Sequence, residues 1–268
     1  MAGLAVDSSI KIHNVYQLVD AELTGRKPLL DMVPVGKKSI CIDDLRRRIL
    51  TNALDPGVYL DEVEIGETYG ISRPPVREAL RQLAGEGYVV LHENRGAQVA
   101  PMSHKTLRNF FVAAPMIYAA VARLAAQHAS PQQIDHLKQI QRAFRVAIRN
   151  HDTTQRALLN QRFHASMGNV ADNEFLLPSL HRLLIDHTRI GMTFYNSRQK
   201  SLSKQQVAAA DQHDQFIALI EAGDADAAAE LALAHWELSR AQIEIFVTPA
   251  SIHIPLGPPP AAKAKVAA

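Results

Sequence analysis

Arginine recurs at every fourth position in the stretch ISRPPVREALRQL, residues 71–83. If this stretch is helical, Arg73, Arg77 and Arg81 stack along one face. Guanidinium groups in such a row can grip phosphate oxygens or the O6/N7 edge of guanine through two parallel hydrogen bonds. The stretch therefore predicts a helix that binds nucleic acid.

Two adjacent prolines stiffen the start of this helix. With Ser72 as the expected N-cap, Pro74 and Pro75 fall in the first turn, where the amide hydrogens they lack have no intrahelical acceptor. Because proline fixes φ, the helix entrance is ordered before any ligand arrives. A narrow apolar stripe on the same helix is expected to face the core of its domain: Val76, Ala79, Leu80 and Leu83.

A row of arginines is more often the solvated face of an amphipathic helix than a binding surface. Two features favour binding here. A short helix and a glycine turn precede the row, which is helix-turn-helix spacing. Residues 39–103 contain seven Arg, no Lys and ten acidic residues, a net charge of −3, yet four of the seven arginines lie on the arginine row and at Arg95.

Three histidines in the second half of the chain form another candidate site. His164, His213 and His235 each lie on the apolar face of a different expected helix, with Asn160 one turn before His164. A single such histidine is usually a hydrogen-bonded core residue. Three imidazoles and one oxygen donor on facing helices suit Zn²⁺, Ni²⁺ or a similar divalent metal.

The elements around the arginine row predict a winged helix-turn-helix over residues 39–102. The expected order is a helix capped by Asp43 or Asp44, a short strand at 58–60, a helix at 62–69, the arginine-bearing helix, and a hairpin of 88–91 with 97–100. Gly70 separates the two central helices, and the hairpin turn contains Arg95 and Gly96.

The elements around the histidines predict an antiparallel helical bundle over residues 103–247. The expected helices are 104–127, 131–150, 152–169, 173–198, 203–222 and 225–246. The fold class is therefore mainly α. Residues 1–38 are interpreted as an extension and linker, either an arm that packs on a partner subunit or disordered. Residues 248–268, rich in Pro and Ala, are expected to be a disordered tail.

Composition limits the broad class. The 268 residues have a net charge of only +2, so nucleic-acid binding must depend on local charge. The single cysteine, Cys41, excludes an internal disulfide framework and suits the cytoplasm. No signal peptide is expected, and the longest apolar run, 110–122, is too short to cross a bilayer and predicts a buried helix.

The quoted residues carry a resemblance to a known family. The run from Glu62 to Val89, followed by RGAQV at 95–99, resembles the DNA-binding domain of GntR-type bacterial transcription regulators. The resemblance implies DNA contacts by these residues: Ser72, Arg73, Pro75, Arg77, Arg81, Arg95 and Gly96. Val63 replaces an arginine that contacts DNA in several members, and Gly66 replaces a usual alanine.

The bundle resembles the C-terminal, FCD-type ligand-binding domain of the FadR-like GntR subfamily. The resemblance rests on NQRFHASMGN (160–169), HDQFIALIEAGD (213–224) and AELALAH (229–235). Many members hold a divalent metal through an Asp and three His. Transferred here, the ligands are Asn160, His164, His213 and His235, with Asn in place of Asp.

In such domains the metal often helps to bind a small carboxylate, together with an arginine on the first bundle helix. This chain has Ala114 near that position and Tyr118 where an acid is frequent, so the expected pocket is more apolar and suits a carboxylate or an aromatic effector. Arg189 is a candidate for the missing positive group; the alternative is a surface arginine. His181 and His187 are interpreted as ordinary helix residues.

The sequence thus predicts a cytoplasmic, homodimeric regulator, expected to be a repressor, that binds a palindromic double-stranded DNA operator and responds to a small-molecule effector near Zn or Ni. No enzyme activity and no membrane partner are expected. A metal-dependent hydrolase is an alternative, because Asp211 and Asp214 flank His213, but it leaves the helix-turn-helix unexplained. A metal-free regulator, in which the histidines only pack, is the third interpretation.

Overall fold

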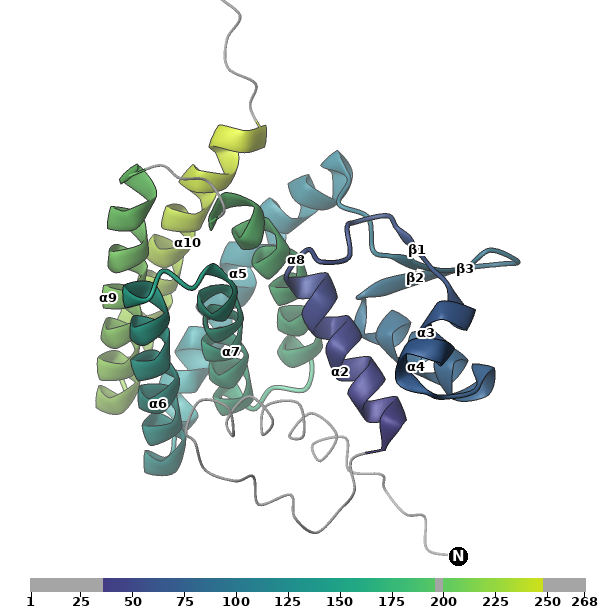
Figure 1. Cartoon of the computed structure of the whole chain (residues 1–268). Coiled ribbons are helices and arrows are strands. Elements are labelled where there is room, and N and C mark those ends of the chain that lie inside the picture. The colour runs from purple at the N-terminus through teal and green to yellow at the C-terminus, as the bar shows by residue number, and fades with distance from the viewer. Residues whose placement is uncertain (1–35, 196–199, 248–268) are drawn as a thin grey trace, which may run out of the picture.

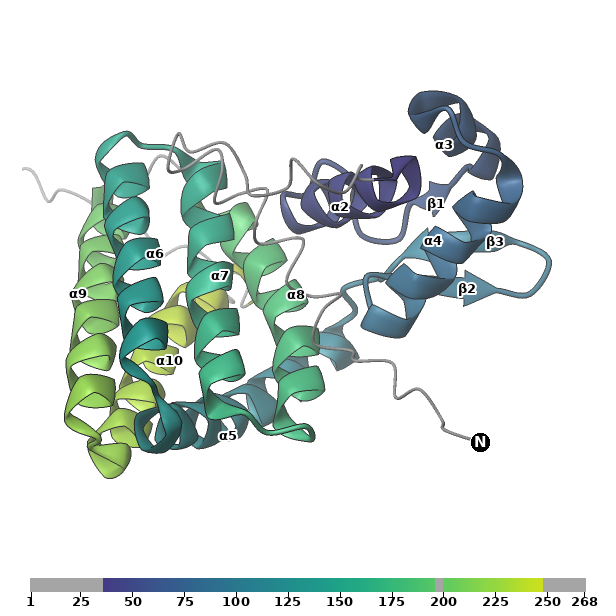
Figure 2. The ribbon, with the colours of Figure 1, turned by 90° about the horizontal axis from the view of Figure 1, so that it is seen from below.

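The computed structural model describes residues 36–195 and 200–247 of the chain. Its N-terminal part contains three helices and a small sheet, and the remainder is helical (Figures 1 and 2). The mainly α fold with an N-terminal winged helix-turn-helix is confirmed. The predicted arm or linker before residue 36 and the predicted disordered tail lie outside the described residues.

The winged helix-turn-helix closely follows the predicted order. Its sheet is antiparallel, with strand order β1-β3-β2. Val89 of β2 pairs with Val99 of β3, and Tyr59 of β1 pairs with Gln98. The elements are α2 (Lys37–Leu50), β1 (Tyr59–Leu60), α3 (Glu62–Tyr69), α4 (Arg73–Glu86), β2 (Val89–His92) and β3 (Gly96–Val99).

The predicted start of the first helix is wrong. Helix α2 begins at Lys37 with Gly36 at its N-cap, so Asp43 and Asp44 lie inside the helix rather than capping it. Each aspartate instead pairs with the arginine three residues later: Asp43 with Arg46 at 2.8 Å and Asp44 with Arg47 at 2.7 Å.

Helices α3 and α4 are joined by a tight turn that depends on glycine. Asp61 caps α3 by accepting from the amides of Val63 and Glu64. Gly70 ends α3 with φ of 58°, a left-handed conformation that glycine adopts at little cost. A side chain on Gly66 would lie 2.9 Å from the Ile71 carbonyl oxygen, so glycine at this position lets the turn approach α3 closely.

Helix α4 buries one stripe and exposes another. Val76, Ala79, Leu80 and Leu83 are buried, as predicted. Ser72 occupies the N-cap position by its backbone, without a side-chain capping bond, and the prolines lie in the first turn. The arginine row lies on the solvent-exposed side of the same helix.

Six helices form the described part of the bundle, each within a few residues of its predicted range. Helices α9, α6, α7 and α8 lie side by side in one layer, and α5 and α10 pack together across that layer (Figure 2). Their bounds are α5 (His104–His128), α6 (Pro131–Arg149), α7 (Thr153–Ala171), α8 (Leu176–Tyr195), α9 (Lys200–Ala222) and α10 (Ala225–Val247).

Helix α5 is long and apolar enough to cross a membrane by length and composition. It instead contributes Phe110, Ala114, Tyr118 and Val121 to the core of the bundle. The predicted buried helix over residues 110–122 is thus part of a packed helical layer. Only 39% of its apolar window is buried within the chain, so one face stays exposed.

Helix α8 packs on both parts of the chain. Ile185 joins the core of the winged helix-turn-helix. Arg189 donates from Nη2 to the carbonyl of Ala100 at 2.7 Å, and Asn52 donates from Nδ2 to the carbonyl of Arg189 at 2.9 Å. Arg189 is 0% exposed, so its interpretation as a surface arginine is wrong.

A glycine on α7 permits close packing against α8. A side chain on Gly168 would lie 2.3 Å from Cδ2 of the fully buried Leu180. We expect Gly168→Ala to lower the free energy of unfolding by about 1 kcal/mol, because overpacking at a buried contact exceeds the gain in helix propensity. Thermal unfolding followed by circular dichroism measures this change.

The matched control is Gly85→Ala on α4, where nothing lies within 4 Å of the added carbon. We expect that substitution to stabilise the chain by about 0.5–1 kcal/mol, since alanine is the better helix former. Stabilisation by both substitutions would contradict the α7–α8 contact.

Candidate functional site

Three histidines from three helices meet inside the bundle. His164 lies on α7, His213 on α9 and His235 on α10, and all three are buried. One ring nitrogen from each lies within 4.8 Å of the others. The ring centroids are 5.1–5.2 Å apart. The structure therefore brings together the three histidines that the sequence selects.

Glutamine side chains are hydrogen-bonded to Nδ1 of two of these rings. Gln141 of α6 donates from Nε2 to the Ala210 carbonyl at 2.7 Å, which leaves its Oε1 to accept from Nδ1 of His213 at 3.2 Å. Gln212 Oε1 lies 2.8 Å from Nδ1 of His235. A proton on Nδ1 leaves Nε2 with a free lone pair, the tautomer that a metal ligand requires.

Burial keeps the three imidazoles neutral. Loss of hydration lowers the pKa of His164 and of His213 well below the usual value, and the neighbouring histidines lower both further. Burial also lowers the pKa of His235 to about 3. Neutral imidazole is the form that binds metals.

The donor set fits a divalent metal. Nε2 of His164 and Nε2 of His213 are buried and have no hydrogen-bond partner among the described residues. Buried polar nitrogens without a partner are costly, and a cation between them would satisfy them. Asn160 lies one turn before His164 on the same side of α7 and is half-buried, so the fourth predicted ligand is on the expected helix face.

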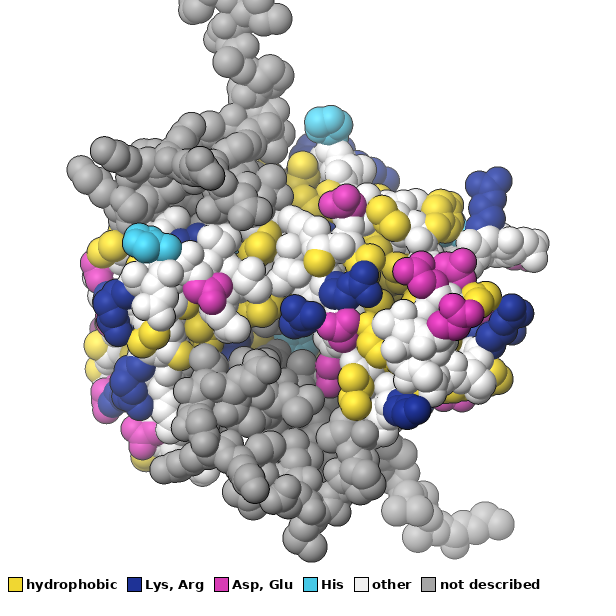
Figure 3. Space-filling view, in the orientation of Figure 1, with side chains coloured by type: hydrophobic (Ala, Val, Ile, Leu, Met, Phe, Trp, Pro, Cys, Tyr) yellow, Lys and Arg dark blue, Asp and Glu magenta, His cyan; other side chains and the backbone are white. Residues whose placement is uncertain are grey.

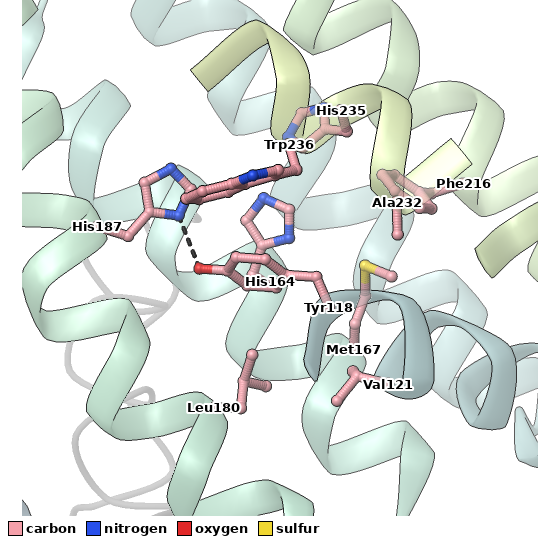
Figure 4. A pocket seen from close by; sticks show the side chains of 10 residues that line it. All are labelled: Tyr118, Val121, His164, Met167, Leu180, His187, Phe216, Ala232, His235 and Trp236. Atoms are coloured by element: carbon pink, nitrogen blue, oxygen red, sulfur yellow. Dashed lines mark hydrogen bonds between the residues drawn. The ribbon is translucent and has the colours of Figure 1, made fainter. Parts of the chain in front are cut away.

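A small cavity of about 10 Å³ adjoins the histidines. That volume holds about one water molecule. Figure 4 shows the side chains around it, which come from α5, α7, α8, α9 and α10. The lining residues are Tyr118, Val121, His164, Met167, Leu180, His187, Phe216, Ala232, His235 and Trp236.

The cavity wall contains a polar pair that the sequence interpretation misses. The hydroxyl of Tyr118 lies 2.8 Å from Nδ1 of His187, and the bond is drawn in Figure 4. His187, interpreted from the sequence as an ordinary helix residue, is buried and lines the cavity. The spacing of Leu180, Leu184 and His187 on one face of α8 is the signal that would have identified it, since all three are buried.

Arg189 is not among the residues that line this cavity. Its guanidinium group lies at the junction of the two parts of the chain, where Nη1 faces Asp186 at 3.3 Å. Arg182 binds the other oxygen of the same carboxylate at 2.8 Å. The structure thus places the predicted effector-binding arginine in an ion-pair network at the domain junction.

The predicted DNA-facing residues are exposed. Ser72, Arg73, Arg77 and Arg81 lie on the solvent side of α4, with Pro75 partly covered. Arg77 donates from Nε to Glu62 of α3 at 2.8 Å. Arg95 and Gly96 are exposed at the turn of the β2–β3 hairpin, where Gly96 has φ of 79°. In Figure 3 the cationic side chains over this domain are interspersed with acidic ones.

The acidic residues beside His213 do not serve the histidine cluster. Asp211 and Asp214 both pair with Arg145 of α6, and about half of each carboxylate side chain is exposed. A hydrolase would need a carboxylate to act as the general base at the metal. The geometry provides none from this pair.

Two family models match separate stretches of the chain. The model described as "Bacterial regulatory proteins, gntR family" matches residues 40–99, and the FCD domain model matches residues 113–238. The HTH-type transcriptional repressor RspR of Escherichia coli (strain K12) is 32% identical over 139 residues, which span 52% of this chain and 61% of the repressor. The gluconate operon transcriptional repressor of Bacillus licheniformis is 22% identical over 197 residues, which span 74% of this chain and 80% of that repressor.

Solved structures share the fold. The structure of E. coli McbR/YncC superposes with a TM-score of 0.66 at 20% identity, covering 80% of this chain and 98% of that one. A putative transcriptional regulator GntR from Rhodococcus sp. RHA1 superposes with a TM-score of 0.59 at 16% identity, covering 80% of this chain and 99% of that one.

Gln141, which is hydrogen-bonded to His213, provides a test of the histidine cluster. We expect Gln141→Leu to weaken Zn²⁺ binding by about 10–100-fold, because His213 loses the acceptor that orients its ring and fixes its tautomer. Competition with a chromophoric chelator measures the affinity. Gln127→Leu, at an exposed position on α5, is the matched control and should bind zinc like the wild type.

The same assay decides between a metal site and a packed histidine core. We expect one zinc per chain in the wild type and none in His213→Ala. A wild-type chain that binds no zinc after reconstitution would leave the metal-free interpretation standing.

Proposed function

We propose that this chain, which belongs to the GntR family of bacterial regulatory proteins and carries an FCD domain, is a metal-dependent, effector-responsive repressor that binds its DNA operator as a dimer. The observation that carries the proposal is the geometry of α4. One stripe of this helix is buried in the domain core, and the opposite side exposes Ser72, Arg73 and Arg77. The exposed hairpin turn lies in the same small domain.

The proposed DNA interface combines the major and the minor groove. Helix α4 enters the major groove, where Arg73 and Arg77 meet phosphates and base edges. Arg81, one turn further on, is proposed to contact a phosphate. The turn at Arg95 and Gly96 is proposed to enter the minor groove. The hydrogen bond from Arg77 to Glu62 restrains the Arg77 side chain before DNA arrives, which limits the side-chain entropy lost on binding.

The proposed sensor is the histidine cluster with its adjoining cavity. His164, His213 and His235 would hold the metal, with Asn160 as a neutral oxygen ligand, and zinc or nickel suits this donor set. The metal supplies a positive site for an anionic effector. The protein supplies the burial that excludes water and the walls that select the molecule.

Helix α8 is the proposed link between sensing and DNA binding. His187 and Leu180 of this helix face the cavity, and Ile185 and Arg189 contact the winged helix-turn-helix. A shift of α8 on effector binding would move the contacts on both of its sides. Operator affinity then changes by the difference in effector affinity between the two arrangements.

The proposal that this chain represses transcription, rather than activating it, is supported by the names of its relatives. Both the RspR protein and the gluconate operon regulator are named transcriptional repressors. Helix α4 with its arginine row is a surface for DNA, which bacteria keep in the cytoplasm. A palindromic operator follows from the proposed dimer, because a two-fold protein matches a two-fold site.

We place the dimer contact on the exposed face of α5. Val112 is 67% exposed and Met116 is 70% exposed, one turn apart on a helix that is otherwise strongly apolar. Large apolar side chains in this setting mark a surface that a partner covers. A second copy of the chain, related by a two-fold axis, would bury the same face of its own α5.

The DNA contact is tested with an operator obtained by selection from random DNA against the wild-type protein. We expect Arg77→Ala to lose about 1–3 kcal/mol for each half-site, which abolishes the mobility shift at wild-type saturating concentrations. Arg142→Ala, an exposed arginine on α6, should bind normally. Full operator binding by Arg77→Ala would overturn the assignment of α4.

The dimer contact is tested by charge. We expect the double substitution Val112→Glu and Met116→Glu to yield a folded monomer in light scattering, because two buried carboxylates per subunit cannot be hydrated in the interface. Val207→Glu places the same charge on the exposed side of α9 and should remain dimeric. A dimeric double variant would exclude this face.

A further inference from the structure

We propose that the effector is an aromatic monocarboxylate with a neutral polar substituent, and that the Tyr118–His187 pair is the contact that selects that substituent. The inference rests on the proposed function, since it requires a metal at the histidine cluster. It restricts the proposed effector to a molecule with one negative charge and a flat aromatic ring. Three features of the cavity wall carry it.

The first feature is the charge of the ligand set. Three neutral imidazoles and a neutral amide leave a divalent cation with its full charge, in a buried place. The described residues that line the cavity include no Asp and no Glu. A buried charge is costly unless it is paired. An effector that brings a negative group to the metal would offset part of this charge, and a carboxylate suits a hard or borderline cation.

The second feature is the lack of a further positive group in the wall. Within the described lining there is no Lys and no Arg, and Arg189 is engaged with Asp186 and the Ala100 carbonyl. A second carboxylate that lies too far from the metal to bind it would be buried with no cationic side chain beside it. The wall therefore discriminates against dicarboxylates and favours a molecule whose remainder is uncharged.

The third feature is the aromatic wall. The rings of Tyr118 and Trp236 are 6.1 Å apart, and Phe216 lies edge-on to His235 at 5.6 Å. Aromatic rings pack favourably in edge-to-face or offset arrangements against such surfaces. Met167, with a flexible thioether side chain, also faces the cavity and can adapt to a flat guest (Figure 4).

Outside the metal-binding histidines and the Trp236 indole, the hydrogen-bonding groups in the described lining are those of the Tyr118–His187 pair. The Tyr118 hydroxyl lies 2.8 Å from Nδ1 of His187, and both side chains line the cavity. A neutral phenol or imidazole can exchange a hydrogen bond with a hydroxyl, and it offers no charge to an anion. The pair therefore reads a neutral substituent on the ring rather than a second acid.

Entry of a ring requires the wall to open. The cavity of about 10 Å³ holds one water, whereas a dry cavity that binds benzene is about 150 Å³. Side chains from α5, α8 and α10 must separate, including His187 on the helix that packs against the winged helix-turn-helix. Binding of an aromatic effector would for this reason change the position of α8 as well as fill the cavity.

The experiment uses the full chain loaded with zinc. Isothermal titration calorimetry gives the affinity for benzoate, 4-hydroxybenzoate, terephthalate and succinate. The emission of Trp236, the chain's single tryptophan and part of the cavity wall, reports whether each compound binds there. We expect saturable binding of the two monocarboxylates with a change in emission, and at least tenfold weaker binding of terephthalate and succinate.

Two variants test the role of the polar pair. Tyr118→Phe should remove the preference for 4-hydroxybenzoate over benzoate and leave benzoate binding within about threefold of the wild type. Tyr59→Phe, an exposed tyrosine of β1, is the matched control and should leave both affinities unchanged. An undiminished preference in Tyr118→Phe would overturn the assignment of the pair.

Failure of the inference is separable from failure of the proposed function. If the chain binds zinc and shifts its operator but binds dicarboxylates as tightly as monocarboxylates, or binds no aromatic acid, the inference alone is overturned. Binding of benzoate that persists in zinc-free His213→Ala would also overturn it. If the wild type binds neither zinc nor operator, the proposed function falls as well.

Discussion

The arrangement of the two parts of this chain depends on a charge that has no access to water. The guanidinium group of Arg189 is fully buried, and its Nη2 donates to the carbonyl of Ala100, directly after the last strand of the winged helix-turn-helix. Asp186 supplies the compensating charge from one turn earlier. A buried ion pair tolerates little displacement, because losing one partner leaves the other charge uncompensated. Because Asp186 and Arg189 both lie on α8, the contact that positions this helix against the winged helix-turn-helix is the hydrogen bond from Arg189 to Ala100, with Ile185 in the core of that domain and His187 buried in the bundle.

Local signals in the sequence predict the elements and the histidine cluster well. The Ser72-Arg-Pro-Pro start, the left-handed Gly70 and the adjacent apolar and arginine stripes are each determined by neighbours within one or two turns. The histidines could be identified because each interrupts an apolar helix face. The first helix shows where such reasoning fails: Asp43 and Asp44 resemble caps, but burial of Cys41 and Ile42 extends the helix upstream of them.

The features that escaped prediction are those set by tertiary contacts. Arg189 resembles a surface residue in the sequence, and only the docking of α8 on the strand end explains its burial. His187 acquires its role from Tyr118, 69 residues away, on a helix that the sequence does not place opposite it. The positions of these partners depend on how the layers pack, which a single helix pattern does not encode.

The closed cavity gives the proposed sensor its energetic basis. A ligand shifts an equilibrium between two arrangements only by its difference in affinity for them. Because the arrangement described here has room for one water beside Tyr118, it has almost no affinity for a larger molecule, so nearly all of the binding free energy of an effector favours the opened form. The hydrogen bonds from Arg189 to the Ala100 carbonyl and from Asn52 to the Arg189 carbonyl join α8 to the winged helix-turn-helix and resist independent movement of the two. In the proposed sensor, opening of the wall at His187 would therefore be transmitted through α8 to the domain that carries α4.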